Sequence, residues 1–243
     1  MTIVSRLLIP TVIAFVFLVP GVYWLLPTLV RSPIPRSDSL AVPATPPPEV
    51  RTKHPNPFVA RSQQRLLEQT VQTLTCIQCD LRGVDLSHLD LSNIDLHQAN
   101  LSRATLDSTV LINAILSDAR LTRANLTQAN LWGADLQDAD LSGVNLDRGQ
   151  LLSASLAHAN LSDASLQEAE LRDADLRSVK ATGANLSNAS LYGAILRHAD
   201  LSGVNFSNAD LRYADLLGAD LTGADLSNAQ LEWATMPDGT VNR

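Results

Sequence analysis

Cys76 and Cys79 are the two cysteines of the chain, and they form the pattern Cys-x-x-Cys that redox centres and zinc sites use. A structural zinc site needs about four ligands, and the sequence has no second cysteine pair to complete one. We therefore predict no metal at this pair and interpret both residues as buried thiols, which are common in protein cores. A disulfide between them is the alternative if this part of the chain is exported from the cytosol.

The histidines and carboxylates are the other candidates for chemistry, and we interpret them as surface residues. His158 and His198 hold equivalent positions in the repeat described below, about 10 Å apart by strand spacing, which is too far to share one metal ion. The sequence contains no G-x-S-x-G, phosphate-binding loop or H-E-x-x-H motif. We therefore predict no catalytic residue, no cofactor, no metal and no small-molecule substrate, so that the protein is not an enzyme. The remaining histidines are His54, His88 and His97.

A five-residue period organises the chain from Leu81 to Leu231. We call each fifth residue in this frame a centre; of the 31 centres, 29 are Leu, and the exceptions are Ala181 and Phe206. The residue two before a centre is small, with Ala at 22 positions and Val at four. The residue directly before a centre is Asp or Asn at 19 positions, so the unit reads A(D/N)LXX. At Ala181 and Phe206 we expect local repacking of an apolar interior and no site.

A period of five matches neither an α-helix at 3.6 residues nor a β-strand at 2. Two apolar residues in each unit, separated and followed by polar ones, describe a short extended segment that ends in a corner. Asp and Asn suit corners because their side chains bond nearby backbone amides. Ser or Thr recurs at every twentieth residue, which indicates that positions twenty residues apart stack on one another. These residues are Ser102, Thr122, Ser142, Ser162, Thr182, Ser202 and Thr222.

On these units the chain resembles the pentapeptide-repeat family, and the resemblance covers about two thirds of the chain. It implies an all-β solenoid, a right-handed quadrilateral β-helix with four units in each coil and with the Leu and small residues pointing inward. The 31 units then make about eight coils, and a spacing of about 4.8 Å gives a rod roughly 37 Å long. We assign the β-helix to residues 75–236 and a C-terminal tail to residues 237–243.

Residues 7–30 are predicted to form a transmembrane helix, because they carry no charge and about 20 such residues span a bilayer. A cleaved signal peptide is the alternative, but its apolar region would have about 7–15 residues and a small-x-small site after it. We therefore predict a single-pass membrane protein with a short N-terminal tail, residues 1–6. Arg6 lies before the span and Arg31 and Arg36 lie after it, so the positive-inside rule leans slightly toward cytoplasmic repeats, but a margin of one or two residues leaves the side undecided.

Two further segments separate this span from the repeats. Residues 31–55 are rich in Pro, Ser and Thr, a composition that favours an extended linker. Residues 56–74 carry one apolar stripe, with Asn56 as the helix cap and Pro57 at the first helical position. We predict a short capping helix there, because the open apolar end of a solenoid needs cover.

The distribution of charge bears on the partners. Residues 1–73 carry a net charge of +4 and residues 74–235 one of −11. An acidic rod repels phosphate backbones, so we predict no nucleic-acid binding. Some members of the family resemble duplex DNA in shape and charge and bind DNA gyrase, which is our alternative function. Against it, those members dimerise through a C-terminal segment that this sequence lacks, and a membrane anchor suits a DNA enzyme poorly.

Four aromatic side chains occupy outward positions that follow centres of a single column, Leu131, Leu191, Leu211 and Leu231. Apolar patches often mark partner sites, and Trp and Tyr are favoured anchors. We therefore predict that this face binds an unknown protein partner or a second copy of the chain, and that the protein is a membrane-anchored interaction or scaffold module. The alternative is that the rings only shield the ladder edges. The candidate face comprises Ile112, Trp132, Leu152, Tyr192, Tyr213 and Trp233, with Val110, Ile115 and Ile195 around an adjoining corner.

Overall fold

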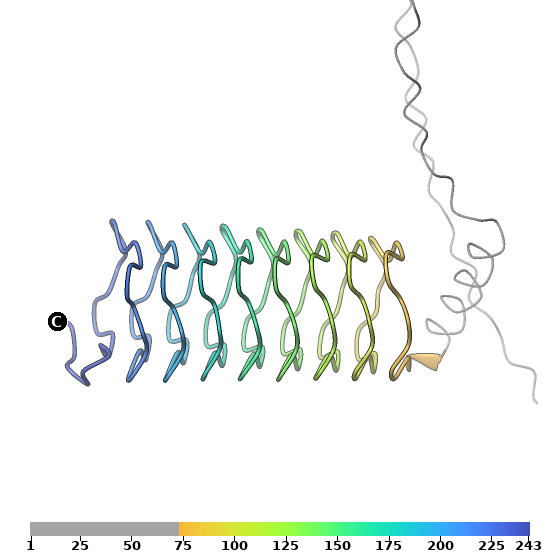
Figure 1. Ribbon diagram of the computed structural model, residues 1–243, viewed down its shortest axis with the longest axis horizontal. Helices are drawn as coiled ribbons and strands as arrows, with labels where there is room; N and C mark the ends of the chain where they lie inside the picture. Colours follow the sequence, from red (N-terminus) through yellow and green to blue (C-terminus); the bar gives the residue numbers. More distant parts are fainter. Residues whose placement is uncertain (1–72) are drawn as a thin grey trace, which may run out of the picture. The chain divides into compact units, whose positions relative to one another are not determined.

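A computed structural model describes residues 73–243, which stack into a rod of coils (Figure 1). Thr73 is helical, and Leu74 begins the turn into the first coil. Within residues 73–243, no helix is long and apolar enough to cross a membrane. The predicted segments 1–6, 7–30 and 31–55 lie outside the described residues, as does the predicted capping helix 56–74 up to residue 72.

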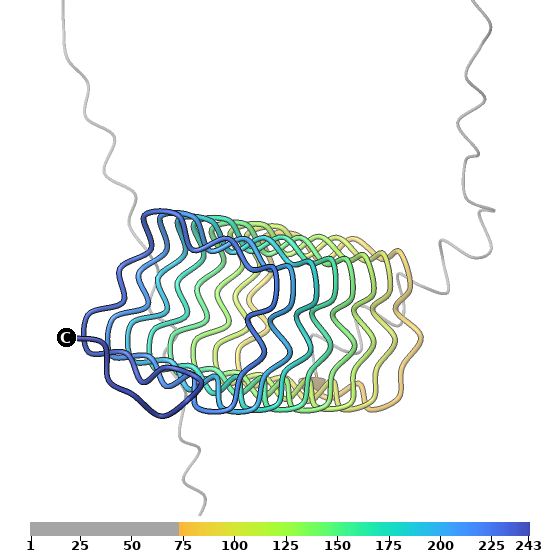
Figure 2. The ribbon, with the colours of Figure 1, turned by 60° about the vertical axis from the view of Figure 1, so that its left-hand side comes forward.

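Each coil contains twenty residues and has four sides. The residue before a centre forms a parallel bridge with the residue twenty positions later, as Thr75 does with Asp95 and Asp95 does with Ile115. These steps continue without a slip to Thr235, which makes the eight coils that the repeat predicts (Figure 2). Every bridge is a single residue pair, so the described coils contain no longer strand. After the last coil the chain turns back, and Thr235 pairs with Val241 in an antiparallel bridge.

Type II turns form the corners of the coil. Such a turn needs a left-handed residue at its third position, and φ is positive there in all 32 turns from Gln78 to Trp233. Glycine holds eight of these positions and other residues hold 24, although a left-handed conformation costs a residue with a Cβ atom about 1–2 kcal/mol. The ladder between coils therefore dictates this backbone geometry, whichever residue stands at the corner.

Backbone hydrogen bonds use four of the five N–H groups in each unit that a further coil covers. The N–H of Leu101 donates to the C=O of Arg120 in the next coil at 2.7 Å, and the N–H of Arg103 donates to the C=O of Thr122 at 3.0 Å. The N–H of Ala104 closes the turn onto Leu101 at 2.9 Å. In the same unit, the N–H of Thr105 donates to the preceding coil. The N–H directly after the centre has no backbone acceptor in this pattern, and a buried or half-buried amide needs one.

The Asp or Asn before each centre accepts a hydrogen bond from that fifth N–H. All nineteen of these side chains do so, from Asp80 to Asp225, as in the bond of 3.0 Å from the N–H of Ser92 to Asp90 Oδ1. The Ser that often follows the centre donates its hydroxyl to the same oxygen, at 2.6 Å in this unit. The Asp residues directly before the centres therefore have a structural role, as their corner positions indicate.

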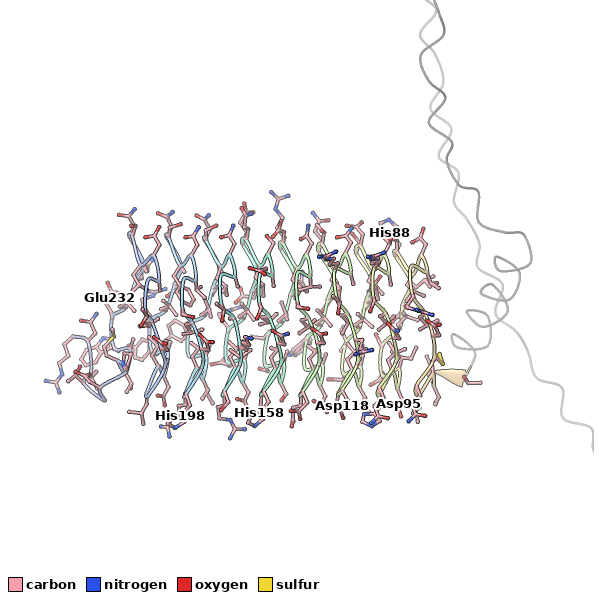
Figure 3. The ribbon with its side chains drawn as sticks, viewed as in Figure 1. His88, Asp95, Asp118, His158, His198 and Glu232 are labelled. Atoms are coloured by element: carbon pink, nitrogen blue, oxygen red, sulfur yellow. A yellow bond between two sulfur atoms is a disulfide. The ribbon has the colours of Figure 1, made fainter. Side chains whose placement is uncertain are left out.

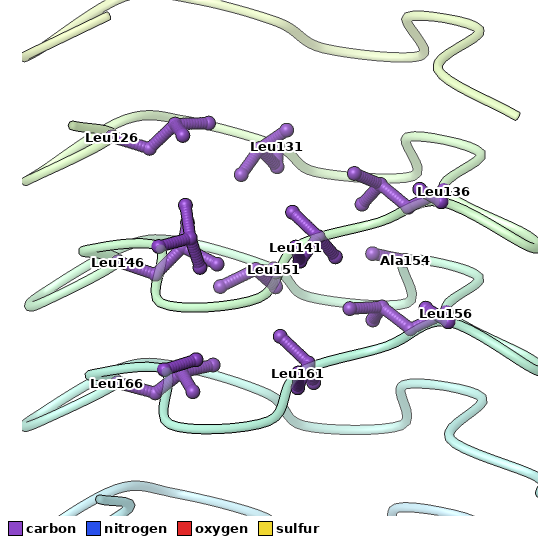
Figure 4. Packing of buried hydrophobic residues seen from close by; sticks show 14 of the residues in the cluster. Leu126, Leu131, Leu136, Leu141, Leu146, Leu151, Ala154, Leu156, Leu161 and Leu166 are labelled. Atoms are coloured by element: carbon purple, nitrogen blue, oxygen red, sulfur yellow. The ribbon is translucent and has the colours of Figure 1, made fainter. Parts of the chain in front are cut away.

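The interior of the rod is filled by stacked Leu and Ala side chains. Leu126, Leu146 and Leu166 lie above one another in successive coils (Figure 4), and each is fully buried. Ala181 and Phe206 are buried as well, at 2% and 0% exposure. In the last coil the inward residues are only half-buried, because no further coil covers them. These residues are Leu221, Ala224, Leu226, Ala229 and Leu231.

The hydrogen bonds at the corners predict how acid affects the rod. Bonds from the hydroxyl and the N–H of the following Ser lower the pKa of Asp85 and of Asp90. A carboxyl whose folded pKa lies below its unfolded value of about 3.9 contributes stability above that pH and loses it as the pH falls through the folded pKa. We expect the pair Asp85→Asn and Asp90→Asn to shift the acid-unfolding midpoint to lower pH, because Asn keeps the acceptor and does not titrate.

Circular dichroism between about pH 2 and pH 5 measures this midpoint. The matched control is Asp138→Asn, because Asp138 is exposed and no turn N–H donates to it within the described coils. The account of the acid sensitivity is wrong if the double variant and the wild-type protein unfold at the same pH.

Candidate partner-binding face

Cys76 and Cys79 hold the two inward positions of the first turn. Cys76 is buried and Cys79 is half-buried against the core. The interpretation of the pair as two thiols is wrong, because their sulfur atoms form a disulfide. The turn places the two Cα atoms 5.3 Å apart, within the range of about 4.4–6.8 Å that a disulfide requires. In this fold, a centre and the residue three positions later therefore suit a disulfide whenever both are Cys.

The described histidines lie on the outside of the coils. His158 and His198 are exposed and project from the same edge of the rod (Figure 3), two coils apart. His97 is half-buried, and its Nδ1 atom lies 3.1 Å from the Oγ atom of Ser117. Within residues 73–243, no group of three or more His, Cys, Asp or Glu side chains is placed to hold a metal ion. His54 lies outside the described residues.

The register places the predicted aromatic face on one side of the rod. Because residues twenty positions apart stack, Ile112, Trp132 and Leu152 follow one another on three successive coils. Trp132 is 53% exposed, whereas Ile112 and Leu152 are half-buried. Tyr213 and Trp233 are 52% and 50% exposed, far more than the fully buried Leu side chains of the interior. The side chains of this column are therefore available to a partner.

Arg172 divides this face into two parts, as its place in the twenty-residue column already indicates. It holds the position between Leu152 and Tyr192, and its Nε atom forms an ion pair with Glu170 at 2.7 Å. We call the two parts the first cluster and the second cluster. The first cluster comprises Ile112, Trp132 and Leu152, and the second comprises Tyr192, Tyr213 and Trp233. Ile115 and Ile195, both exposed, flank the first and the second cluster respectively, and Val110 is half-buried.

The second cluster is a stack of three rings on successive coils. The ring centres of Tyr192 and Tyr213 are 5.1 Å apart, and those of Tyr213 and Trp233 are 6.5 Å apart with planes at 16°. The guanidinium of Arg212 lies 5.6 Å from the centre of the Tyr192 ring. Tyr213 and Trp233 have φ values of 59° and 63° at turn positions where glycine fits without strain. The chain thus presents aromatic rings where a smaller residue would fold more easily.

Arg212 also ties this stack to the acidic surface. Its guanidinium donates two hydrogen bonds to Asp210, at 2.9 and 2.7 Å. These bonds raise the pKa of Arg212 and lower the pKa of Asp210. A cation that is fixed over a ring in this way adds a polar edge to an apolar contact surface.

The rod also has a groove that was not predicted from the sequence. A groove of about 1130 Å³ lies on the side of the rod opposite the aromatic column, over the coils that begin with the centres Leu81 to Leu161. Arg82, Arg103, Arg120 and Arg123 line it, together with the Ser and Thr side chains that stack every twentieth residue. The sequence does contain a signal for this groove, because Arg103 and Arg123 are twenty residues apart and directly follow Ser102 and Thr122 of the hydroxyl column.

Comparison with known proteins identifies the same five-residue repeat. A family model for pentapeptide repeats matches the chain in eight copies. No curated protein matches the chain. The segments that the family model matches are residues 79–118, 119–156, 150–180, 169–208 and 199–236.

Several solved structures are similar to the chain. HetL, a pentapeptide repeat protein involved in heterocyst differentiation regulation from the cyanobacterium Nostoc sp. strain PCC 7120, is 32% identical, and the match covers 72% of this chain and 97% of HetL with a TM-score of 0.26. The pentapeptide repeat protein alr5209 from Nostoc PCC 7120 is 32% identical over 45% of this chain and 84% of its own, with a TM-score of 0.25. QnrB1, a plasmid-mediated fluoroquinolone resistance protein, is 22% identical over 62% of this chain and 80% of its own, with a TM-score of 0.37.

Proposed function

This chain belongs to the pentapeptide-repeat family, and from that premise we propose that it is a non-enzymatic interaction or scaffold module anchored in a membrane. Family membership also implies the right-handed sense of the β-helix. A fold does not fix a function, so the proposal rests on surface features of this chain. The interior of the rod is filled with Leu and Ala side chains, which leaves the outer faces to carry the activity.

The stacked rings of Tyr192, Tyr213 and Trp233 are the observation that carries this proposal. Each ring is between 37% and 52% exposed, and the three lie side by side on a rigid backbone. Trp and Tyr dominate the binding energy of many interfaces, because they bury a large area at a small cost in side-chain entropy. The partner that suits this stack is a protein surface with an apolar patch, or the same face of a second copy.

The proposed anchor is the uncharged segment 7–30. Its length favours a spanning helix, and the Pro-rich residues 31–55 would hold the coils away from the bilayer. Two observations bear on the side that the coils face. The charges that flank the segment are nearly balanced, whereas the disulfide between Cys76 and Cys79 favours an oxidising compartment.

If the aromatic face binds a partner, removal of its rings should weaken that association. We expect the double variant Trp132→Ser and Tyr192→Ser to fold normally, because both rings are exposed. A contact between two aromatic rings adds only about 0.5–1.5 kcal/mol to the free energy of unfolding. Its self-association in sedimentation experiments, or its pattern of cross-linked partners in cells, should weaken by about tenfold or more. A further variant, Tyr213→Ser and Trp233→Ser, tests the second cluster alone.

The matched control replaces Gln128 and Gln137 by Ser, since both are exposed at equivalent turn positions on other sides of the rod. Far-ultraviolet circular dichroism shows whether each variant keeps the coils. The proposal fails if the aromatic variants associate and cross-link as the wild-type protein does.

The second prediction concerns the anchor and the side of the membrane. We expect the full chain to sediment with membranes after a carbonate wash, and a chain that lacks residues 1–30 to be released. If the coils face an oxidising compartment, Cys76 and Cys79 should react with a maleimide only after a reductant is added. A protease that reaches a C-terminal tag before the inner membrane is breached would agree with that result. Release of the full chain by carbonate would contradict the anchor.

A further inference from the structure

The basic side chains of the coils divide into a paired set and an unpaired set. Six arginines form ion pairs with carboxylates, at distances of 2.6 to 2.9 Å. Arg103, Arg120 and Arg123 form no ion pair with any residue from 73 to 243, and neither does Lys180. All three of these arginines line the groove of about 1130 Å³. Residues 74–235 carry a net charge of −11, and their arginines without a direct ion pair lie together in this groove, which Asp140 and Asp163 also line.

Arg103 and Arg123 stand on successive coils in the same column. The N–H of Arg103 donates to Thr122, and the N–H of Arg123 donates to Ser142 in the equivalent bond of the next coil. The coils are about 4.8 Å apart, and like charges on directly opposed residues destabilise a sheet. Two exposed arginines on successive coils place like charges near one another, and an anion bound beside them would offset this repulsion.

A second pair of stacked arginines shows how the chain treats such a repulsion elsewhere. Arg177 and Arg197 also hold successive coils, but each has its own carboxylate, Asp175 and Asp215 respectively, at 2.6 Å. In the groove, Arg82 is neutralised in the same way by Asp80 at 2.6 Å. Arg103 and Arg123 therefore differ from Arg177 and Arg197, because neither forms an ion pair with a carboxylate of residues 73–243.

Two glycines flank the arginine column. Gly83 and Gly143 occupy the same column as the two arginines, one coil before and one coil after them. A Cβ atom at Gly83 would meet no other atom, whereas one at Gly143 would lie 3.4 Å from Arg123 Cγ. The open space for a ligand in this column therefore lies at Gly83, and the aliphatic part of Arg123 covers Gly143.

We propose that this groove binds a phosphoryl group, which Arg103 and Arg123 hold with their guanidinium forks and Arg120 contacts from the neighbouring corner. Guanidinium matches phosphate oxygens in a bidentate manner, and such charge-assisted bonds are stronger than neutral ones. The phosphoryl group can belong to a small phosphomonoester or to the phosphodiester of a lipid headgroup. A long polyanion does not suit the site, because the rest of the rod is acidic.

Asp140 lines the groove next to Arg120, with which it forms a parallel bridge. Burial raises the pKa of Asp140, but hydrogen bonds from Ser142 and Thr122 and the charge of Arg120 outweigh this effect and lower the pKa. The carboxylate is therefore ionised at neutral pH and compensates part of the charge of Arg120. It also repels an anion from its side of the groove, so that the phosphoryl group is directed toward Arg103 and Arg123.

The test titrates the purified full chain, in a nonionic detergent, with glycerol 3-phosphate and with glycerophosphoglycerol by isothermal titration calorimetry at constant ionic strength. We expect binding of at least one probe, and a loss of about tenfold or more in affinity in the double variant Arg103→Gln and Arg123→Gln. The variant Arg103→Lys and Arg123→Lys keeps the charge without the fork and should bind with intermediate affinity. The control Arg177→Gln and Arg197→Gln should bind as the wild-type protein does.

The two probes distinguish the source of the ligand. Tighter binding of glycerol 3-phosphate would identify a phosphomonoester, and equal or tighter binding of glycerophosphoglycerol would identify a lipid headgroup. The proposal is overturned if neither probe binds, or if the Gln variant of Arg103 and Arg123 binds as tightly as the control variant. If the variant Arg103→Gln and Arg123→Gln does not fold, the variant Arg103→Lys and Arg123→Lys decides the question. Wild-type affinity of this Lys variant for the probe would contradict the role of the guanidinium groups.

Discussion

Backbone hydrogen bonding between coils ties every part of the rod to a period of twenty residues. The N–H of each centre meets a C=O group nineteen residues later, as Leu101 meets Arg120 at 2.7 Å. One inserted residue would place every later Leu out of step with the Leu beneath it, so the frame holds for eight coils. With the backbone fixed in this way, an interior of Leu and Ala suffices, because each coil covers the apolar groups of the one before.

The same register decides what each outer face contains. A side chain at a given corner has, as its neighbours, the side chains twenty residues before and after it, so a column acquires a chemical character of its own. One side of the rod carries rings and aliphatic side chains, interrupted by Arg172, and the opposite side carries arginines and hydroxyls. The nineteen Asp and Asn side chains before the centres each accept a turn N–H, so the Asp residues among them contribute to the fold as well as to the surface charge.

The period made the fold, the number of coils and the inward Leu positions predictable from the sequence. Column arithmetic also placed Trp132, Tyr192 and their neighbours on one side. The same arithmetic places Arg172 between Leu152 and Tyr192, so the break in the aromatic face was also predictable; only its ion pair with Glu170 was not. The disulfide was not predictable from periodicity, because Cys76 joins Cys79 through a type II turn that brings the two Cα atoms to 5.3 Å. Hydrophobic periodicity indicates which residues are buried, but not which side chains form bonds with one another.

The fold-back of the last residues has a consequence for the end of the rod. A parallel stack exposes a template at its final coil, and exposed edges of this kind recruit further chain. On one of the four sides, the N–H of Trp233 donates to Asn242 at 2.6 Å, although in earlier coils that donor serves the next coil. Thr235 pairs with Val241 in the antiparallel sense, which a parallel coil is unable to continue. On that side the tail thus occupies the hydrogen-bond donor and the bridge position that a further parallel coil would use, and it does so with a strand of the opposite direction instead of with bulk.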